Sequence, residues 1–374
     1  MKKKVGIITL HRVTNYGSVL QAYALQEKIK EIGYDVQIID YRPSRAKMSN
    51  MLKGLKDKNN LLKKSIIIRT IVRAIMLPSY ILRFRTFKKF LNKYLNLTGE
   101  YYVEEEDFTN SNNLSFDIYC TGSDQVWNSE WNGKIDKPLF LSFVSDNNKK
   151  IAYAASFGKK KLDSWEMEET KKLLDRYDYI SVRELDGLNI LKELGIKNAK
   201  CVLDPTLLLN GDEWRKLSSN KFKKEEYILV YNLNRNKRIH DYAVRLSKKT
   251  GCKIKYITYQ IHDFYKKGHM YCNTSVENYL SLIDNAKYIV TDSFHGVAFS
   301  INFNKNFIVI YPDKFSSRLE SILNLTKLTN RVVKKENNEL LLDSINYDNV
   351  NKSLLEYRNK SIHYLVKSLG DNNE

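Results

Sequence analysis

Short apolar runs of strand character alternate with helix-compatible segments along the chain, and this alternation restricts the fold more than any other feature. Strands separated by helices are typical of βαβ units and parallel sheets. The predicted strands form two series, which cover residues 4–10, 35–40, 116–120, 151–155, 178–182 and 200–203, then 227–233, 253–258, 287–291 and 307–311, with a weaker candidate at 331–333. We therefore expect an α/β protein with two Rossmann-like domains whose parallel sheets face a cleft.

The domain boundaries follow from the gap between the two series. A polar, charged stretch at 205–225 separates them, and 374 residues exceed what one simple core accommodates. We expect an N-terminal domain at 1–210 and a C-terminal domain at 211–345. An amphipathic helix and tail at 346–374 complete the chain.

Small, polar or charged residues follow six of the predicted strands. In the segment KYIVTDSFHGVAF at 287–299, a strand runs into a polar turn that contains His295, and a helical pattern follows. Ligands bind at the carboxyl ends of strands in open α/β sheets, and the N–H groups of a following helix favour an anion. Histidine binds phosphate or moves a proton near neutral pH. Small and polar residues are common in turns, so the residues at any single strand end have a structural explanation. Six such strand ends in one chain predict a cleft lined by these residues.

The cysteines and the apolar segments indicate a cytoplasmic protein. The four cysteines are widely spaced and none forms a C-x-x-C pair, which is typical of free thiols in a reducing compartment. The apolar run near the N-terminus, residues 5–10, is too short for a signal peptide. No uncharged apolar stretch reaches the length of a membrane span.

A basic segment at 45–99 carries +13 of the net charge of +19. Apolar residues share one side of its predicted first helix, namely Ile67, Ile68, Ile71, Val72, Ile75 and Met76. Pro78 predicts a break before a second amphipathic stretch at 80–95.

Three interpretations of this basic segment stay open. It is a helical insertion whose apolar side packs on the domain, a contact with an anionic membrane surface, or an electrostatic funnel for an anionic substrate. The membrane hypothesis places the protein peripherally at the inner face of the cell membrane. Nucleic acid is not expected as a partner, because the charge comes without a nucleic-acid-binding motif.

Six motifs occur in an order that resembles one protein family. They are Asn15-Tyr16-Gly17-Ser18 with the helix that follows, Thr121-Gly122-Ser123-Asp124-Gln125-Val126-Trp127-Asn128, Tyr153-Ala154-Ala155-Ser156-Phe157-Gly158, Ser181-Val182-Arg183-Glu184, Asp204-Pro205-Thr206 and Thr291-Asp292-Ser293-Phe294-His295-Gly296. On these residues the chain resembles the polysaccharide pyruvyltransferase family from about residue 5 to 320. The basic segment 45–99 lies outside the motifs and is interpreted as a helical insertion in the first domain.

The resemblance implies a GT-B-like fold and a specific activity. Phosphoenolpyruvate would be the donor and a sugar of a cell-surface polysaccharide, or of its lipid-linked precursor, the acceptor. The product would be a pyruvate ketal, with phosphate released and no metal or cofactor needed. A GT-B glycosyltransferase that uses a nucleotide sugar in the same pathway is the alternative, since one fold hosts several chemistries. A non-catalytic glycan- or lipid-binding protein is the third hypothesis, which predicts a damaged cleft.

A donor with a carboxylate and a phosphate needs fixed cations and helix-end N–H groups. We predict His295, Arg183 and Asp124 as catalytic, with His295 as proton donor or phosphate ligand and Asp124 as base. The predicted donor-binding residues are Ser293, His295, Gly296, Arg183 and Arg318. The predicted acceptor-binding residues are Asn15, Ser18, Gln21, Ser123 and Gln125.

Each assignment has a structural alternative. Arg183 could form a salt bridge with Glu184 or Asp186. Helix capping is the common role of residues such as Asn15, Ser18 and Asp124. Trp127 and Trp131 are candidates to stack on a sugar ring, although a structural role is the commoner one.

Overall fold

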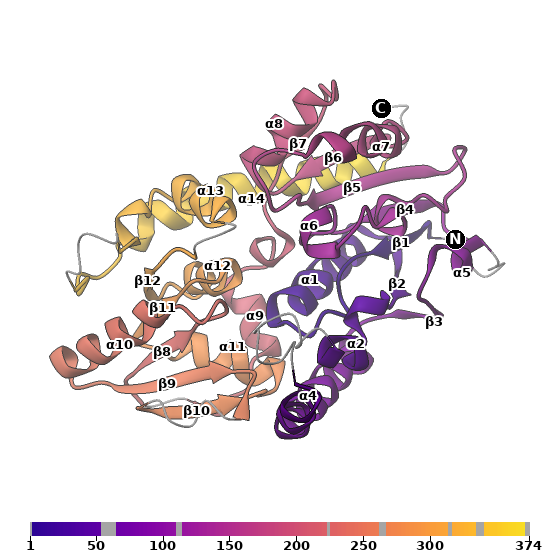
Figure 1. Ribbon diagram of the computed structural model, residues 1–374. Helices are drawn as coiled ribbons and strands as arrows, with labels where there is room; N and C mark the ends of the chain where they lie inside the picture. The colour runs from indigo at the N-terminus through magenta and orange to yellow at the C-terminus, as the bar shows by residue number, and fades with distance from the viewer. Residues whose placement is uncertain are drawn as a thin grey trace.

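Two parallel sheets with helices packed around them form the protein, which is described by a computed structural model over residues 2–53, 65–109, 114–222, 225–261, 267–312, 316–333 and 340–370 (Figure 1). The first sheet has seven strands in the order β3-β2-β1-β4-β5-β6-β7, and the second has five in the order β10-β9-β8-β11-β12. Every strand pairing in both sheets is parallel. The predicted two-domain α/β architecture is confirmed.

The first sheet contains an interior strand, β1, that is buried from residue 5 to residue 8, and its residues Val5 and Ile7 are inaccessible to solvent. Its strands are β1 (Lys4–Ile8), β2 (Asp35–Tyr41), β3 (Leu97–Tyr102), β4 (Ile118–Thr121), β5 (Lys149–Ala155), β6 (Tyr179–Val182) and β7 (Lys200–Cys201). Its helices are α1 (Tyr16–Ile32), α2 (Met48–Lys53), α4 (Ile66–Tyr94), α5 (Glu105–Thr109), α6 (Ser129–Asn132), α7 (Ser164–Leu174) and α8 (Leu185–Glu193). Continuous burial along β1 is what a parallel sheet covered on both faces requires.

The second sheet repeats the same construction on a smaller scale. Its strands are β8 (Tyr227–Tyr231), β9 (Lys253–Thr258), β10 (His269–Cys272), β11 (Tyr288–Thr291) and β12 (Asn306–Val309). Its helices are α9 (Gly211–Leu217), α10 (Lys237–Thr250), α11 (Val276–Asp284), α12 (Phe294–Asn302) and α13 (Ser317–Leu325). The strand β8, buried along its whole length, is the centre of this sheet.

The last helix, α14 (Tyr347–Leu369), connects the two domains, as Figure 1 shows. Near its start the Tyr347 hydroxyl donates to the carbonyl of Lys305 in the second domain, at 2.6 Å. Towards its end the Ser361 hydroxyl accepts from the Leu203 N–H at 3.0 Å, and the Leu369 carbonyl accepts from the Tyr34 hydroxyl. The helix therefore ties the C-terminal part of the chain back onto the first domain.

Two strands were not predicted, and both lie at sheet edges. The strand β3 exposes Gly99, Glu100 and Tyr101, so it lacks the alternating apolar pattern, and β10 is only partly buried. At the predicted 331–333 strand, the chain forms a single bridge between Val309 and Val332. Edge strands of this kind are positioned by pairing, which composition alone does not reveal.

The predicted break at Pro78 is wrong, because α4 runs unbroken through it. A proline inside a helix removes one backbone hydrogen bond, and here the next residue anchors the helix to another part of the chain. The Ser79 hydroxyl accepts from the Ile261 N–H, and the Ser79 carbonyl accepts from the Asn273 side chain, both at 3.0 Å. These contacts hold α4 against the second domain.

The N-terminal half of α4 leaves most of its predicted apolar side exposed. Ile67 is 69% exposed, Ile71 54% and Ile75 60%, whereas Met76 is buried. In the described part of the segment, this side therefore does not pack on the domain. Residues 54–64 of the predicted basic segment lie outside the described residues. No described helix is long and apolar enough to cross a membrane.

Candidate functional site

The carboxyl ends of β1, β4 and β11 place polar side chains around a cavity of 260 Å³. The predicted site residues in its lining are Asn15, Ser18, Asp124, Gln125, Ser293, His295 and Arg318. They come from both domains, so the cavity lies where the two sheets face each other. This is the position at which ligands bind in open α/β folds.

Four predicted residues do not line this cavity: Arg183, Gln21, Ser123 and Gly296. Gln21 is fully buried and donates to the Thr9 hydroxyl and to the Ser18 carbonyl, each at 2.9 Å. Ser123 is also inaccessible to solvent, and its hydroxyl donates to Asp204 at 2.9 Å. These side chains support the residues of the lining.

Arg183 lies in a buried network of carboxylates. Its side chain is inaccessible to solvent and donates to Asp204 at 2.9 Å and to Asp124 at 3.2 Å. Glu184 is 3.6 Å from the Arg183 Nε, as the salt-bridge alternative expected. Arg183 is therefore placed to orient these carboxylates, and a bidentate contact with a ligand would require it to exchange partners.

Asp204 is the centre of this network and was not among the predicted site residues, although its motif was recognised. One carboxylate oxygen accepts from Arg183 and Ser123, and the other accepts from the Thr206 N–H and hydroxyl. Burial opposes ionisation, but the charges of His295 and Arg183 and the Thr206 hydrogen bonds outweigh it and lower the pKa of Asp204. Its position after a predicted strand was the signal available in the sequence.

His295 stands on the first turn of α12, between Asp204 and the start of α1. Its Nε2 is 3.9 Å from Asp204 and has no hydrogen-bond partner in the described structure. Burial is the main influence and lowers the pKa of His295 to about 4, against the opposing effect of Asp204 and Asp124. The imidazole is therefore neutral at pH 7, and its Nε2 is a buried polar atom without a partner among the described residues.

Asp124 has an uncommon backbone conformation, with φ at 77°. Left-handed residues other than glycine are uncommon and are found at functional sites. The Asp124 carboxylate accepts from the Ser18 hydroxyl at 2.5 Å. Burial would raise its pKa, but the charges of Arg183 and His295 and the Ser18 hydrogen bond lower the pKa of Asp124 to about 2.

Arg318 supplies a cation to the lining from α13. Burial, reinforced by the like charge of Arg183, lowers the pKa of Arg318 to about 10, so it is still charged at pH 7. Its Nε is buried without a hydrogen-bond partner among the described residues. This unsatisfied donor suits an anionic ligand, because buried polar atoms are normally paired.

Two predicted ligand residues also cap helices. The Asn15 side chain accepts from the Gly17 N–H at the start of α1, and Ser293 accepts from the Gly296 N–H at the start of α12. Capping was the structural alternative considered for Asn15, and it is confirmed. Asp124 caps no helix; its carboxylate accepts from the Gln125 N–H at 2.9 Å. The caps direct two helix N-termini to the site, where they favour an anion.

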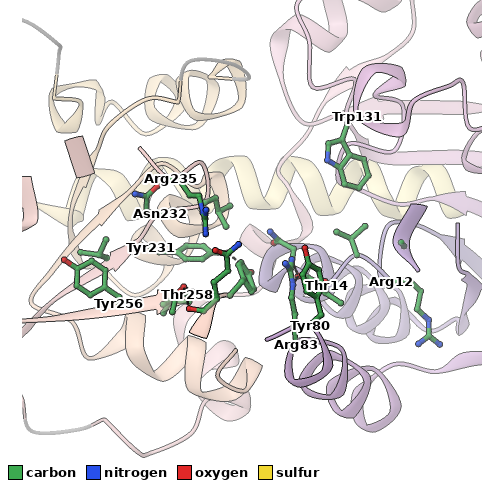
Figure 2. Close-up of a pocket in the computed structure, with 18 of the residues that line it drawn as sticks. Arg12, Thr14, Tyr80, Arg83, Trp131, Tyr231, Asn232, Arg235, Tyr256 and Thr258 are labelled. Atoms are coloured by element: carbon green, nitrogen blue, oxygen red, sulfur yellow. Dashed lines mark hydrogen bonds between the residues drawn. The ribbon is translucent and has the colours of Figure 1, made fainter. Parts of the chain in front are cut away.

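A second cavity of 570 Å³ lies beside the first and shares Val13, Asn15, Trp131 and Leu233 with it. Figure 2 shows side chains from both domains around it, including Arg83 and Tyr80 of α4 opposite Tyr231 and Arg235. Trp127 is buried and structural, whereas Trp131 is 41% exposed and lines both cavities. Arg83 lies within the predicted basic segment. The sequence did not single it out as a site residue, because many other lysines and arginines surround it there.

Gly17 gives His295 the space that it occupies. A Cβ built at Gly17 would lie 1.9 Å from the His295 Nδ1. We expect Gly17→Ala to displace the ring and, where His295 is a reacting group, to lower kcat by about 100-fold, since small misplacements of reacting groups are costly. Gly99→Ala is the control, because a Cβ there meets nothing within 4 Å. Unchanged turnover in a folded Gly17→Ala protein would contradict this role.

Solved structures with similar folds have low sequence identity. S. aureus MnaA, in a co-structure with UDP, aligns with a TM-score of 0.51 and 11% identity over 99% of this chain and 93% of that chain. The Methanocaldococcus jannaschii UDP-GlcNAc 2-epimerase has a TM-score of 0.47 and 14% identity, over 98% of this chain and 99% of that chain. The E. coli heptosyltransferase WaaC has a TM-score of 0.43 and 10% identity, over 96% of this chain and 99% of that chain. The likeness to MnaA, the one of these three with a TM-score above 0.5, supports the two-domain GT-B-like fold and no activity.

Comparison of the sequence with known proteins identifies the family. No curated protein matches the chain. The family model described as polysaccharide pyruvyl transferase matches residues 15–314, which include every motif quoted above and most of the chain. The chain therefore belongs to the polysaccharide pyruvyl transferase family and is a transferase.

Proposed function

We propose that the protein transfers pyruvate from phosphoenolpyruvate to a sugar and forms a pyruvate ketal. The observation that carries this proposal is the pair of unsatisfied polar atoms, His295 Nε2 and Arg318 Nε, on residues that line the 260 Å³ cavity. A small donor with a carboxylate and a phosphate fits this cavity in size, and Arg318 is its cationic partner there, beside the carboxylates of Asp124 and Asp292 that also line the cavity. The N-terminus of α12 adds a favourable field for the phosphate.

His295 is the proposed donor for the proton transfer that starts the reaction. A proton added to C3 of the enol makes C2 electrophilic, and a first sugar hydroxyl adds to C2. The C–O bond to phosphate then breaks, and a second hydroxyl of the same sugar adds to C2 and closes the ketal, with its proton leaving on the released phosphate. The negative charge of a bound donor would raise the pKa of His295 from about 4 and allow the imidazole to carry that proton. Arg318 would stabilise the charge on the leaving phosphate.

Asp124 is the proposed base for the attacking hydroxyl. Its pKa of about 2 makes it a weak base while Arg183 and Ser18 hold it. A donor anion that competes for this cationic environment would raise that pKa. The Ser18 hydroxyl, 2.5 Å away, marks where an acceptor hydroxyl could approach the carboxylate.

The test is phosphate release from phosphoenolpyruvate with a panel of synthetic and lipid-linked glycosides. We expect products whose mass increases by pyruvate less one water. If phosphoenolpyruvate is not consumed but a nucleotide sugar is, the glycosyltransferase alternative replaces this proposal. If neither phosphoenolpyruvate nor a nucleotide sugar is consumed, the result favours the hypothesis of a non-catalytic glycan- or lipid-binding protein.

We also propose that the protein works in the cytoplasm, at an anionic membrane surface. In α4, Ile67, Ile71 and Ile75 form an exposed apolar stripe at i, i+4 and i+8, and Arg69 and Arg73 lie in the same turns. Basic helices with an exposed apolar side insert into the headgroup region of bilayers. A lipid-linked acceptor would be present at this surface.

We expect the double variant Ile71→Asp/Ile75→Asp to bind vesicles of anionic lipid at least about tenfold more weakly at low salt. The reason is that carboxylates would replace apolar side chains that the wild-type protein inserts into the bilayer. Leu355→Asp is the matched control, since Leu355 is 53% exposed on α14. Flotation with neutral and anionic vesicles measures the effect. Failure of the wild-type protein to float with anionic vesicles would refute membrane contact.

A further inference from the structure

The larger cavity has a composition that the donor site does not explain. Among the described residues that line it are four arginines, with no aspartate or glutamate. Its volume of 570 Å³ is within the usual range for small-molecule sites. Trp131 belongs to the lining of both cavities, so a ligand in the larger one would reach the catalytic residues at this junction.

Two of these arginines are only partly neutralised by the protein. Arg83 donates through Nε and Nη2 to a backbone carbonyl, that of Thr14, and its guanidinium lies 4.0 Å from the centre of the Tyr259 ring. Arg45 pairs with Asp136 through Nη1, but its Nε and Nη2 are buried without a partner among the described residues. By contrast, Arg12 is bound on two nitrogens by Asp40.

We propose that the larger cavity binds the phosphate or diphosphate group of the acceptor through Arg83 and Arg45. This inference rests on the proposed function only in calling the ligand an acceptor. Guanidinium groups bind phosphate oxygens bidentately, and unsatisfied N–H groups such as those of Arg45 favour such a ligand. The centre of the Trp131 ring lies 5.3 Å from the Arg45 guanidinium. The sugar of the acceptor would stack against this ring and direct a hydroxyl toward Asp124 in the smaller cavity.

A diphosphate-bearing acceptor could be a nucleotide or a lipid derivative, and the two share the chemistry recognised here. Uridine diphosphate and geranyl diphosphate are therefore the probes, and calorimetric titration of the full chain without donor measures their affinities. We expect at least one to bind. Its dissociation constant should rise by about 10- to 100-fold in Arg83→Met and in Arg45→Met, as the loss of a charged hydrogen bond implies.

Arg85→Met is the matched control, because Arg85 lies on the same helix as Arg83, is exposed and does not line the cavity. Arg318→Met separates the two cavities, since Arg318 lines only the smaller one. Thermal unfolding identifies variants that fail to fold. If Arg83→Met fails to fold, Arg45→Met still tests the phosphate site.

The inference is overturned if neither probe binds, if Arg85→Met weakens binding as much as Arg83→Met, or if binding depends on Arg318 instead. The tighter of the two probes shows whether the acceptor is a nucleotide or a lipid derivative. Because donor is absent from this titration, failure of phosphoenolpyruvate consumption would refute the proposed function and leave the phosphate site standing.

Discussion

Replacing His295 with Gln is expected to lower kcat for pyruvyl transfer by about 10²- to 10⁴-fold, the usual effect of removing a general acid. The change is nearly isosteric, so the ring's place between Gly17 and Asp204 stays filled. Phosphate release from phosphoenolpyruvate measures the loss. His269→Gln on β10 is the control, because His269 lines neither cavity.

The pKa of His295 adds a second readout to the same variant. Burial lowers this pKa to about 4, so the ring binds almost no proton at pH 7. If the donor raises the pKa above 7, binding must take up about one proton, and the variant must take up none. Calorimetry in two buffers with different ionisation enthalpies measures this uptake. Normal turnover in His295→Gln, or no uptake by the wild-type protein, would remove His295 as the proton donor.

Much of the fold was predictable from the sequence, because a parallel sheet buried on both faces requires apolar strands with polar turns at their ends. The central strands β1 and β8 have these features and were predicted. The exposed edge strand β3 and the unbroken helix through Pro78 depend on partners that are distant in the sequence. Local patterns do not contain that information.

The candidate site was predictable to a similar extent. Motifs at strand ends identified His295 and Asp124, which the structure brings into one cavity. They did not show that Arg183 lies below the lining and contacts Asp204, because burial of an arginine depends on the carboxylates around it. The arginines of the larger cavity come from separate segments and meet only in the folded protein.

Replacing Arg183 with Met is expected to destabilise the protein by about 3–5 kcal/mol, because it leaves buried carboxylates without their cation. Asp204, Asp124 and Glu184 all lie within 3.6 Å of the Arg183 side chain. Arg215→Met, which removes partly exposed pairs with Asp212 and Asp284, should cost no more than about 1 kcal/mol. Denaturant unfolding measures both.

The sign of the pH dependence distinguishes this account from a simple loss of packing. The wild-type pKa of Asp124 is lowered to about 2, so its contribution to stability is present above the unfolded pKa and is lost as pH falls toward 2. Without Arg183 the part of that contribution that its charge supplies is lost. The difference in unfolding free energy between wild type and variant should therefore narrow as the pH is lowered from 7 to 3. A packing defect would give a difference that does not change with pH.

A double-mutant cycle tests whether Arg183 acts through Asp204. Asp204→Asn removes one of the carboxylates that Arg183→Met leaves unpaired, so the double variant should be more stable than the sum of the two single losses predicts, by about 1–3 kcal/mol. The same cycle with Asp284→Asn, which does not contact Arg183, should be additive. Additivity for Arg183 and Asp204 would mean that their 2.9 Å contact does not hold the site together, and the buried network would then have to be explained by Asp124 and Glu184 alone.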